Sequence, residues 1–305
     1  MDLRQLRYFL EIVEQGSISR AAARLNVAQP ALSIHLRNME LDLGTELLIR
    51  SRQGVQPTEA GMLLVRHARF VLSEQSKAED EIRQLGKEPS GEVRIGLPGT
   101  ISEILTIPLI EAMTRKFPRI RLTISEAMSG FVAGWLRDGE IDLAILYVRP
   151  SDQSMESVKL LEEELLAFSA PQGLTGQAIT LDELVTRPLI LPSRAHGLRQ
   201  MLDLACEEMA QVIQPVIEID SYKNIKALVS RGLGVSILPH HAIAEDWRAG
   251  RLSAVPISPS MKRSAYLVSR ANARPSRLVR IVRQVLEDVT LELIESGEWA
   301  GARRV

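Results

Sequence analysis

The sequence predicts an α plus α/β fold, with a helical N-terminal region, one long helix and a larger α/β region. Three observations predict it. Residues 1–58 contain short amphipathic helical segments, residues 58–86 keep a helical apolar period without a proline, and from residue 92 onward strand-like and helix-like segments alternate. A chain of 305 residues is long enough for about two domains. We therefore expect parts of different architecture.

The composition excludes several classes of protein. Apolar residues make up 45% and charged residues 25%, as in ordinary globular proteins. The single cysteine, Cys206, cannot form an internal disulfide, which excludes a disulfide-stapled scaffold, and its expected position in a helix favours packing over nucleophilic catalysis. No apolar run approaches the roughly 18 residues that span a bilayer, and the first residues lack a signal-peptide core. We expect a cytoplasmic protein.

Residues 3–58 predict three short helices followed by a hairpin. An apolar stripe that ends at Gly16 gives the first helix, and Ser17 is a suitable N-cap for the second. Residues 26–28 form a turn, and Pro30 suits the start of a third helix because its missing N–H costs no hydrogen bond there. We expect the inner face of the third helix to consist of Leu32, Leu36, Met39 and Leu43.

The outward face of the third helix carries residues suited to reading DNA. A short helix held away from a second helix by a turn is the arrangement with which a helix-turn-helix enters the major groove. Gln reads adenine with two hydrogen bonds, Ser bonds to either base type, and Ile can contact the methyl group of thymine. We expect these residues to face bases: Gln29, Pro30, Ala31, Ser33 and Ile34.

Arginines supply the charge for phosphate contacts, although the net charge of −1 gives no global indication of nucleic-acid binding. Residues 17–37 contain three arginines and no acid, and residues 47–58 form a hairpin-like stretch with two more. Such a wing can place guanidinium groups on phosphates or in the minor groove, and helix N-termini offer N–H groups to phosphates. We expect these residues to hold the DNA backbone or the minor groove: Ser17, Arg20, Arg37, Arg50 and Arg52.

The segment from Thr58 to about Gly86 predicts one long helix. Thr58 is a plausible N-cap, with Glu59 in the first turn, where the helix dipole favours a negative charge. A helix of this length spans about 40 Å, and alone it has nothing to bury its apolar stripe against. We therefore expect it to pair with a second copy of the chain. The stripe consists of Leu64, Val65, Ala68, Leu72, Ala78, Ile82 and Leu85.

From Glu92 onward the alternation of strands and helices predicts βαβ units on a parallel sheet. We expect strands at residues 92–96, 121–125, 141–148, 189–191, 215–220, 235–238 and 265–269. We expect helices at residues 101–117, 132–138, 198–212, 222–230 and 276–294. About 210 residues is a large number for one such sheet, so two lobes are expected.

The N-terminal residues resemble the LysR-type transcriptional regulators. The resemblance rests on residues 3–9, 16–22, 25–33, 43–44, 47–48, Arg50 and 57–61. It implies a winged helix-turn-helix, a linker helix that dimerises, and a two-lobed effector-binding domain similar to periplasmic binding proteins. The implied boundaries are 1–58 for the DNA-binding domain, 59–90 for the linker and hinge, and 91–305 for the effector domain, with lobes at 91–162 plus 268–305 and at 163–267.

The resemblance also implies function and partners. Members of the family bind interrupted palindromes near promoters, usually as dimers of dimers. We therefore expect a regulator without catalytic activity or cofactor, a homodimer or homotetramer that binds double-stranded DNA, a small carboxylate-like effector and RNA polymerase, but no membrane. Residues 97–100, 105–109 and 145–147 resemble the nitrogen-assimilation-control branch, some members of which need no effector. Where the family commonly places Gln or Arg and then Gln after the serine of the third helix, this chain has Ile34 and His35, so no operator sequence carries over.

Loops after the expected strands predict the effector site, because ligands of open α/β sheets bind beyond the C-terminal ends of the strands. Residues 97–102 and 127–130 place hydroxyl and N–H groups at helix N-termini, which suit an anion, and residues 192–196 would contribute from the second lobe. A purely structural helix-capping role for Ser and Thr is the alternative. The expected contacts are Thr100, Ser102, Ser129, Ser193, Arg194 and His196.

An enzyme or a solute-binding protein is the main alternative class. His240 and His241, followed by Glu245, match no metal-ligand spacing and are expected to be solvated loop residues. Residues 232–237 lack the third glycine of a dinucleotide fingerprint, and the chain contains no Gly-x-Ser-x-Gly elbow. The N-terminal residues disfavour a solute-binding protein. A steep dependence of DNA affinity on salt distinguishes a regulator from both classes.

Overall fold

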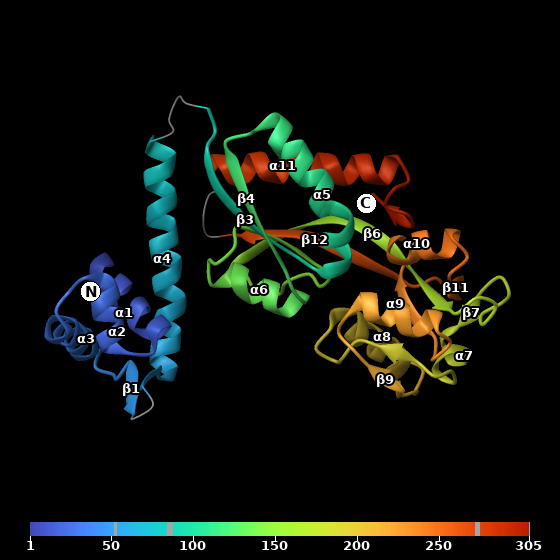
Figure 1. Cartoon of the computed structure of the whole chain (residues 1–305), viewed down its shortest axis with the longest axis horizontal. Helices are drawn as coiled ribbons and strands as arrows, with labels where there is room; N and C mark the ends of the chain where they lie inside the picture. The colour runs from blue at the N-terminus through green and yellow to red at the C-terminus, as the bar shows by residue number, and fades with distance from the viewer. Residues whose placement is uncertain (52–53, 84–87, 272–274, 305) are drawn as a thin grey trace. The chain divides into compact units, whose positions relative to one another are not determined.

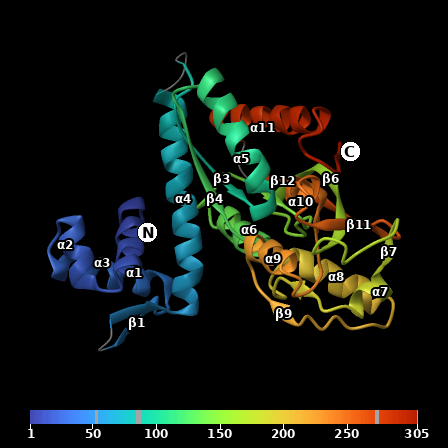
Figure 2. The same ribbon diagram turned by 45° about the vertical axis from the view of Figure 1, so that its right-hand side comes forward.

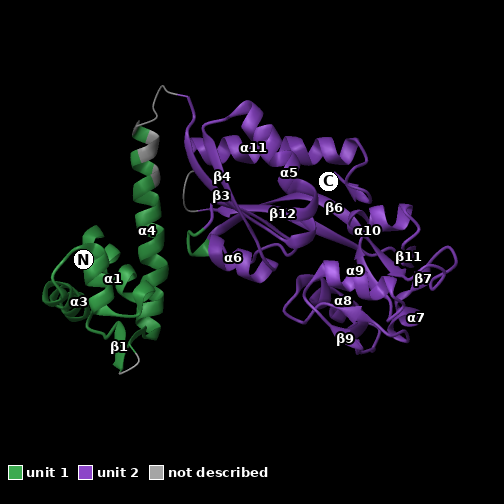
Figure 3. Ribbon diagram, viewed as in Figure 1, with its two compact units in different colours: residues 1–87, 137–140 green, residues 88–136, 141–305 purple. Residues whose placement is uncertain are grey.

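The computed structural model describes residues 1–51, 54–83, 88–271 and 275–304 (Figure 1). The chain divides into two compact units (Figure 3). Unit 1 contains residues 1–87 and 137–140, and unit 2 contains residues 88–136 and 141–305. The domain boundaries expected from the sequence stay a prediction. None of the helices in the described ranges has the length and apolar content needed to span a membrane.

Unit 1 consists of helices and one hairpin. Its elements are α1 (Leu3–Gln15), α2 (Ile18–Leu25), α3 (Gln29–Leu43), β1 (Leu48–Ser51), β2 (Gly54–Pro57) and α4 (Glu59–Arg83). Gly16 ends α1 in the left-handed conformation, and the Ser17 side chain caps α2 by accepting a hydrogen bond from the N–H of Arg20. Thr58 caps α4, since its hydroxyl oxygen accepts a hydrogen bond from the N–H of Gly61. The expected helices and hairpin are confirmed.

One core holds unit 1 together, and the first half of α4 belongs to it. The buried residues include Phe9, Ile12, Leu32, Leu36, Met39, Leu64, Val65 and Ala68. The expectation that Leu43 lines the inner face of α3 is wrong, because its side chain is 46% exposed. Leu43 is the last residue of α3 and lies beyond the part of the helix that packs on α1 and α2. The far half of the α4 stripe is also outside the core: Ile82 is 73% exposed, and Leu85 lies outside the described residues.

Unit 2 is an α/β structure. Its helices are α5 (Gly99–Lys116), α6 (Ser129–Arg137), α7 (Leu181–Val185), α8 (Gly197–Glu207), α9 (Tyr222–Ser230), α10 (His240–Arg248) and α11 (Arg277–Glu295). Its strands are β3 (Gly91–Leu97), β4 (Ile120–Glu126), β5 (Leu143–Leu146), β6 (Met155–Ser169), β7 (Ile179–Thr180), β8 (Ile190–Leu191), β9 (Ile217–Glu218), β10 (Ser236–Pro239), β11 (Ser253–Ser258), β12 (Lys262–Arg270) and β13 (Ala302–Arg303).

The main sheet is mixed, so the expectation of a purely parallel sheet is wrong. Its strand order is β4-β3-β5-β12-β6-β11-β7, with β10 and β13 also paired to β6. The pairs of β3 with β4 and with β5 are parallel, but β12 runs antiparallel to both β5 and β6. Sequence analysis missed β6, β7, β11, β13 and α7, and it extended α8 to residue 212 although the helix ends at Glu207. The reversal of direction comes from β12, which lies between β5 and β6 and runs antiparallel to both, so that β6 keeps the direction of β3, β4 and β5.

Unit 2 has two lobes, and its described residues form three buried clusters, two in lobe A and one in lobe B. In lobe A, strands β3, β4 and β5 are covered by α5 and α11, which lie side by side (Figures 1 and 2), and the core includes Ile95, Leu105 and Leu286. In lobe B, the core includes Phe168 and Ile237. Strands β6 and β12 take part in both lobes. In β6, Leu161 packs in lobe A and Leu165 in lobe B, whereas in β12 Ala265 packs in lobe A and the preceding Met261 lies against lobe B.

Candidate nucleic-acid interface and effector region

The outward face of α3 is exposed over its first two turns. Gln29, Pro30, Ala31 and Arg37 are exposed, and the apolar side chain of Ile34 is 58% exposed. Gln29 donates a hydrogen bond from its amide nitrogen to the Ser33 hydroxyl, with 3.0 Å between Nε2 and Oγ. This bond orients the Gln29 amide along the helix face while its Oε1 and second N–H remain available for another group.

Contacts with α1 fix the position of α3. His35 lies edge-on to the Tyr8 ring, with 5.3 Å between ring centroids. Arg4 donates from Nε to the Tyr8 hydroxyl at 2.7 Å, and its guanidinium carbon lies 5.2 Å from the ring centroid. Sequence analysis assigned no role to Arg4 or Tyr8. The Tyr8 ring contacts His35, and Arg4 contacts Tyr8 in turn. His35, at a position where the family commonly has Gln, therefore faces α1.

The expected phosphate-binding residues differ in their surroundings. Arg37 and Arg50 are exposed and have no acidic partner among the described residues. Arg20 donates from Nε to the Gln15 carbonyl at 3.1 Å and also from Nη2, so its guanidinium lies on the C-terminus of α1. Arg52 lies outside the described residues.

The wing is docked on the loop between α1 and α2. The N–H of Val55 donates to the carbonyl of Gly16 at 2.9 Å. Gly54 has φ +127°, and a Cβ at this position would lie 2.5 Å from the Gly16 carbonyl oxygen, so only glycine fits. Arg50 is the register partner of Val55 in the β1–β2 pair. The docking therefore holds the wing beside the residue that caps α2, Ser17.

The expected effector residues of lobe A are mostly engaged by the protein itself. Thr100 is buried, and its hydroxyl contacts Arg263 Nη2 at 2.8 Å and the Tyr147 hydroxyl at 2.7 Å. The Ser102 hydroxyl contacts that of Thr106 at 3.1 Å. Ser129 is half-buried at the start of α6.

The expected residues of lobe B also differ in burial. Ser193 donates from its N–H and its hydroxyl to the Asp220 carboxylate at 2.8 and 2.9 Å. The side chain of Arg194 is 72% exposed. His196 is buried, and its Nε2 lies 2.7 Å from the Tyr222 hydroxyl. The structure thus brings Thr100 and His196 into the interior of unit 2 and leaves Arg194 at the surface.

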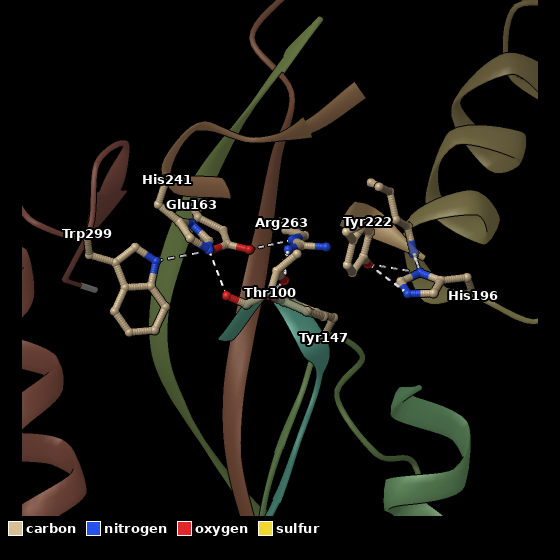
Figure 4. A network of polar contacts seen from close by, with 9 residues as sticks. Thr100, Tyr147, Glu163, His196, Tyr222, His241, Arg263 and Trp299 are labelled. Carbon is tan, nitrogen blue, oxygen red and sulfur yellow. Dashed lines mark hydrogen bonds and ion pairs between the residues drawn. The ribbon is translucent and has the colours of Figure 1, made fainter. Parts of the chain in front are cut away.

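An ion pair lies where the two lobes meet (Figure 4). Arg263 of β12 and Glu163 of β6 are register partners, and the Arg263 Nε donates to the Glu163 carboxylate. The other carboxylate oxygen accepts a hydrogen bond from Trp299 Nε1 at 3.2 Å and lies 3.4 Å from His241 Nδ1. His241 donates from Nε2 to the Thr100 carbonyl at 2.9 Å, which links α10 of lobe B to α5 of lobe A.

The pKa values indicate that the ion pair is charged and the nearby histidines neutral. Burial opposes both charges, but the Arg263 charge lowers the pKa of Glu163, and Glu163 raises that of Arg263. Burial lowers the pKa of His241, and burial together with the Arg263 charge lowers that of His196 to about 4. Burial also raises the pKa of Tyr222 to about 12. At neutral pH the cluster therefore holds one positive and one negative charge.

The expectation that His240 and His241 are solvated loop residues is wrong. His240 is the first residue of α10, and the His241 side chain is 3% exposed. No cluster of three or more His, Cys, Asp or Glu side chains in the described ranges could hold a metal ion. Cys206 is buried in the core of lobe B.

A winged helix-turn-helix joined to a two-lobed α/β unit defines a ligand-responsive class of DNA-binding regulator. A family model described as a bacterial regulatory helix-turn-helix protein of the lysR family matches residues 3–62, and the LysR substrate binding domain matches residues 86–290. The chain therefore belongs to the LysR family. It is a DNA-binding transcriptional regulator of the LysR type, and its relatives are regulators rather than enzymes.

Individual relatives match along nearly the whole chain. The nitrogen assimilation regulatory protein nac of Escherichia coli K12 is 32% identical over 98% of this chain and 99% of its own length, in agreement with the resemblance to that branch. The structure of a full-length OxyR variant from Pseudomonas aeruginosa is 25% identical, has a TM-score of 0.72 and covers 95% of this chain and 94% of OxyR. The structure of full-length CbnR with its target DNA has 22% identity and a TM-score of 0.54 over 95% of this chain and 100% of CbnR, and supports the fold.

Proposed function

We propose that α3 and the wing bind duplex DNA, with the outward face of α3 in the major groove. The observation that carries this proposal is the contrast between the two faces of α3: Leu32 and Leu36 are buried, whereas Gln29, Ile34 and Arg37 are exposed. An exposed helix face with an amide and an apolar group at its N-terminal end matches the chemistry of base edges. Exposed arginines without acidic partners among the described residues supply the attraction for phosphates.

Each expected contact residue has a proposed role. Gln29 and Ser33, which are hydrogen-bonded to each other, read a base edge together, and Ile34 contacts a thymine methyl group. Arg37 and Arg50 neutralise phosphates. The remaining assignments rest on position in the sequence alone. Pro30 and Ala31 are assigned to the base edges, and Ser17, Arg20 and Arg52 are assigned to the phosphates or the minor groove.

We propose that the protein acts as a homodimer or homotetramer through α4. Val71 and Ile82 are 40% and 73% exposed and lie about three helical turns apart, so they share one face of α4. A second copy of α4 would cover this face, and the two-fold symmetry of such a pair would present α3 twice. The DNA site is then an interrupted palindrome near a promoter, and RNA polymerase is a proposed further partner.

We propose that unit 2 is the sensing part, in which a small effector changes the arrangement of the lobes and thereby the spacing of the dimers on DNA. Of the expected contact residues, Arg194 is the exposed cation and the one best suited to a carboxylate-like effector arriving from solvent. In this proposal Ser102, Ser129 and Ser193 supply hydroxyl groups to the effector. Thr100 and His196 supply a hydroxyl group and an imidazole ring from the interior of unit 2.

Selection of bound sequences from a pool of random duplexes tests the DNA-binding proposal directly. The purified full chain should enrich duplexes with an inverted repeat, since a symmetric dimer reads the same half-site twice. Fluorescence anisotropy with an enriched duplex and with a scrambled one then measures specificity. An enriched pool without any repeated half-site would contradict the dimeric arrangement, and no enrichment would contradict specific binding.

A further inference from the structure

We propose that the junction of the two lobes is a guanidinium-binding site that the chain fills with its own residue, Arg263. The walls of this site are Glu163 from β6, Thr100 from α5 and Tyr147, which follows β5 (Figure 4). The walls therefore select a planar cation with several N–H donors. In the wild-type chain this cation is the guanidinium group of the Arg263 side chain. The proposal goes beyond the sensing role proposed for unit 2 and does not rest on it, because the site is filled in the wild-type chain.

The walls accept hydrogen bonds from the Nε and Nη2 groups of the guanidinium and leave the buried Nη1 without a hydrogen-bond partner among the described residues. The Arg263 Nε donates to the Glu163 carboxylate, and Nη2 donates to the Thr100 hydroxyl at 2.8 Å and to the Tyr147 hydroxyl at 2.7 Å. The guanidinium carbon lies 3.6 Å from the centroid of the Tyr147 ring, which gives the cation an aromatic face as well. An ammonium group is a point charge and cannot bond to these acceptors and stack on this ring at the same time.

The site is closed and its charges balance. Arg263, Glu163 and Thr100 are buried, so the ion pair is shielded from water and salt. Glu163 receives a second hydrogen bond from Trp299 Nε1, which is made to the carboxylate oxygen that Arg263 does not contact. A buried carboxylate without a cation is costly, so Glu163 stays charged only while a cation occupies this position.

The occupied site also connects the two lobes. Thr100 is the second residue of lobe A's helix α5 and is held at its hydroxyl by Arg263 and at its carbonyl by His241 of lobe B. Arg263 lies between Met261, which packs on lobe B, and Ala265, which packs in lobe A. Arg263 thus occupies the junction in the manner of a ligand, and an external guanidinium compound finds the site already filled.

Chemical rescue tests the proposal. In purified full-length Arg263→Ala, we expect a lowered melting temperature, and methylguanidinium at about 10 mM should raise it by a few degrees, because a ligand that binds only the folded state stabilises it. Methylammonium chloride at the same concentration controls for charge and ionic strength and should have no effect. The wild-type chain, whose site is filled, should respond to neither compound.

The double variant Glu163→Gln, Arg263→Ala is the matched control, because it has the same vacated space without the carboxylate. It should not respond to methylguanidinium, and a rescue as large as in the single variant would overturn the assignment of Glu163. If Arg263→Ala does not fold, the yield of folded protein on refolding becomes the measurement, and methylguanidinium should raise it.

An absence of rescue by either measurement would overturn the proposed site. Melting temperature needs no DNA, so failure of this proposal is distinguishable from failure of the DNA-binding proposal.

Discussion

The outer face of unit 1 and the lobe junction of unit 2 use the same residue type in opposite ways. Arg37 and Arg50 are exposed and have no acidic partner among the described residues, whereas Arg263 is buried against Glu163. An exposed arginine adds little to stability, and its interaction with phosphates weakens with salt. A buried arginine is shielded from salt, and its removal leaves its partner uncompensated. Arginine in the first environment serves binding, and in the second it serves structure.

The largest expected effect comes from breaking the buried pair. Glu163→Gln leaves the Arg263 charge without its counter-ion and should lower the free energy of unfolding by about 3–5 kcal/mol. Urea denaturation of the purified chain measures this change. The neighbouring Glu162→Gln is the control, because its partners Lys159 and Arg303 are 32% and 61% exposed, so its ion pairs are open to solvent where the Glu163–Arg263 pair is not. Equal losses in the two variants would contradict the special role of the buried pair.

The next largest effect concerns α4. Val71→Glu and Ile82→Glu place charges on the exposed face and should dissociate the dimer, because a like-charged pair replaces an apolar contact across the two-fold axis. Sedimentation velocity should show a shift toward monomer, and affinity for a palindromic duplex should fall on the order of tenfold or more. Exposed Glu79→Gln on the same helix is the control. If neither Val71→Glu nor Ile82→Glu shifts the chain toward monomer, the dimer interface does not lie on this face of α4.

Base reading should show as a smaller effect that is confined to specificity. Ser33→Ala should reduce the preference for an enriched duplex over a scrambled one by about 1–3 kcal/mol, because one base edge loses its partner. Gln29→Ala should relax the same base position, since the two side chains are hydrogen-bonded to each other. Binding to the scrambled duplex should stay unchanged. A loss that is equal for both duplexes would assign Ser33 to the phosphates instead.

The elements of unit 1 could be predicted because their signals are local. Gly16 ends a helix, Ser17 begins one, and Pro30 fits a first helical turn, each within a few residues of the element that it marks. The same holds for α5, α9 and α11. The exposed face of α3 followed from its period, but the contact of His35 with the Tyr8 ring did not, because it depends on how α1 and α3 pack.

The cluster at the lobe junction could not be predicted because its members are far apart in the sequence. Glu163, His241 and Arg263 meet only through the pairing of β6 with β12 and the position of α10. One local signal did exist. Leu161, Glu163 and Leu165 alternate with Glu162 and Glu164 at the period of a strand, which indicates that the middle glutamate faces the core. The run of three glutamates instead resembles a solvated segment.

The smallest expected effect is a dependence of stability on pH. Burial lowers the pKa of His196 from 6.5 to about 4 and also lowers that of His241. As the pH falls from 6.5 toward 4, the unfolded chain therefore binds protons that the folded chain does not, and the free energy of unfolding falls. Urea midpoints at pH 7 and pH 5 measure this change, and His196→Gln should make it smaller. A wild-type midpoint that is the same at both pH values would contradict the burial of these histidines.

The dependence of DNA affinity on salt tests the central claim, that the exposed face of unit 1 binds duplex DNA, most directly. The logarithm of the affinity of the wild-type chain should fall steeply with the logarithm of the salt concentration. Arg37→Ala and Arg50→Ala should each weaken binding to all duplexes and reduce the slope by about one, with the melting temperature unchanged. A slope that is unaltered in both variants would contradict the proposed interface.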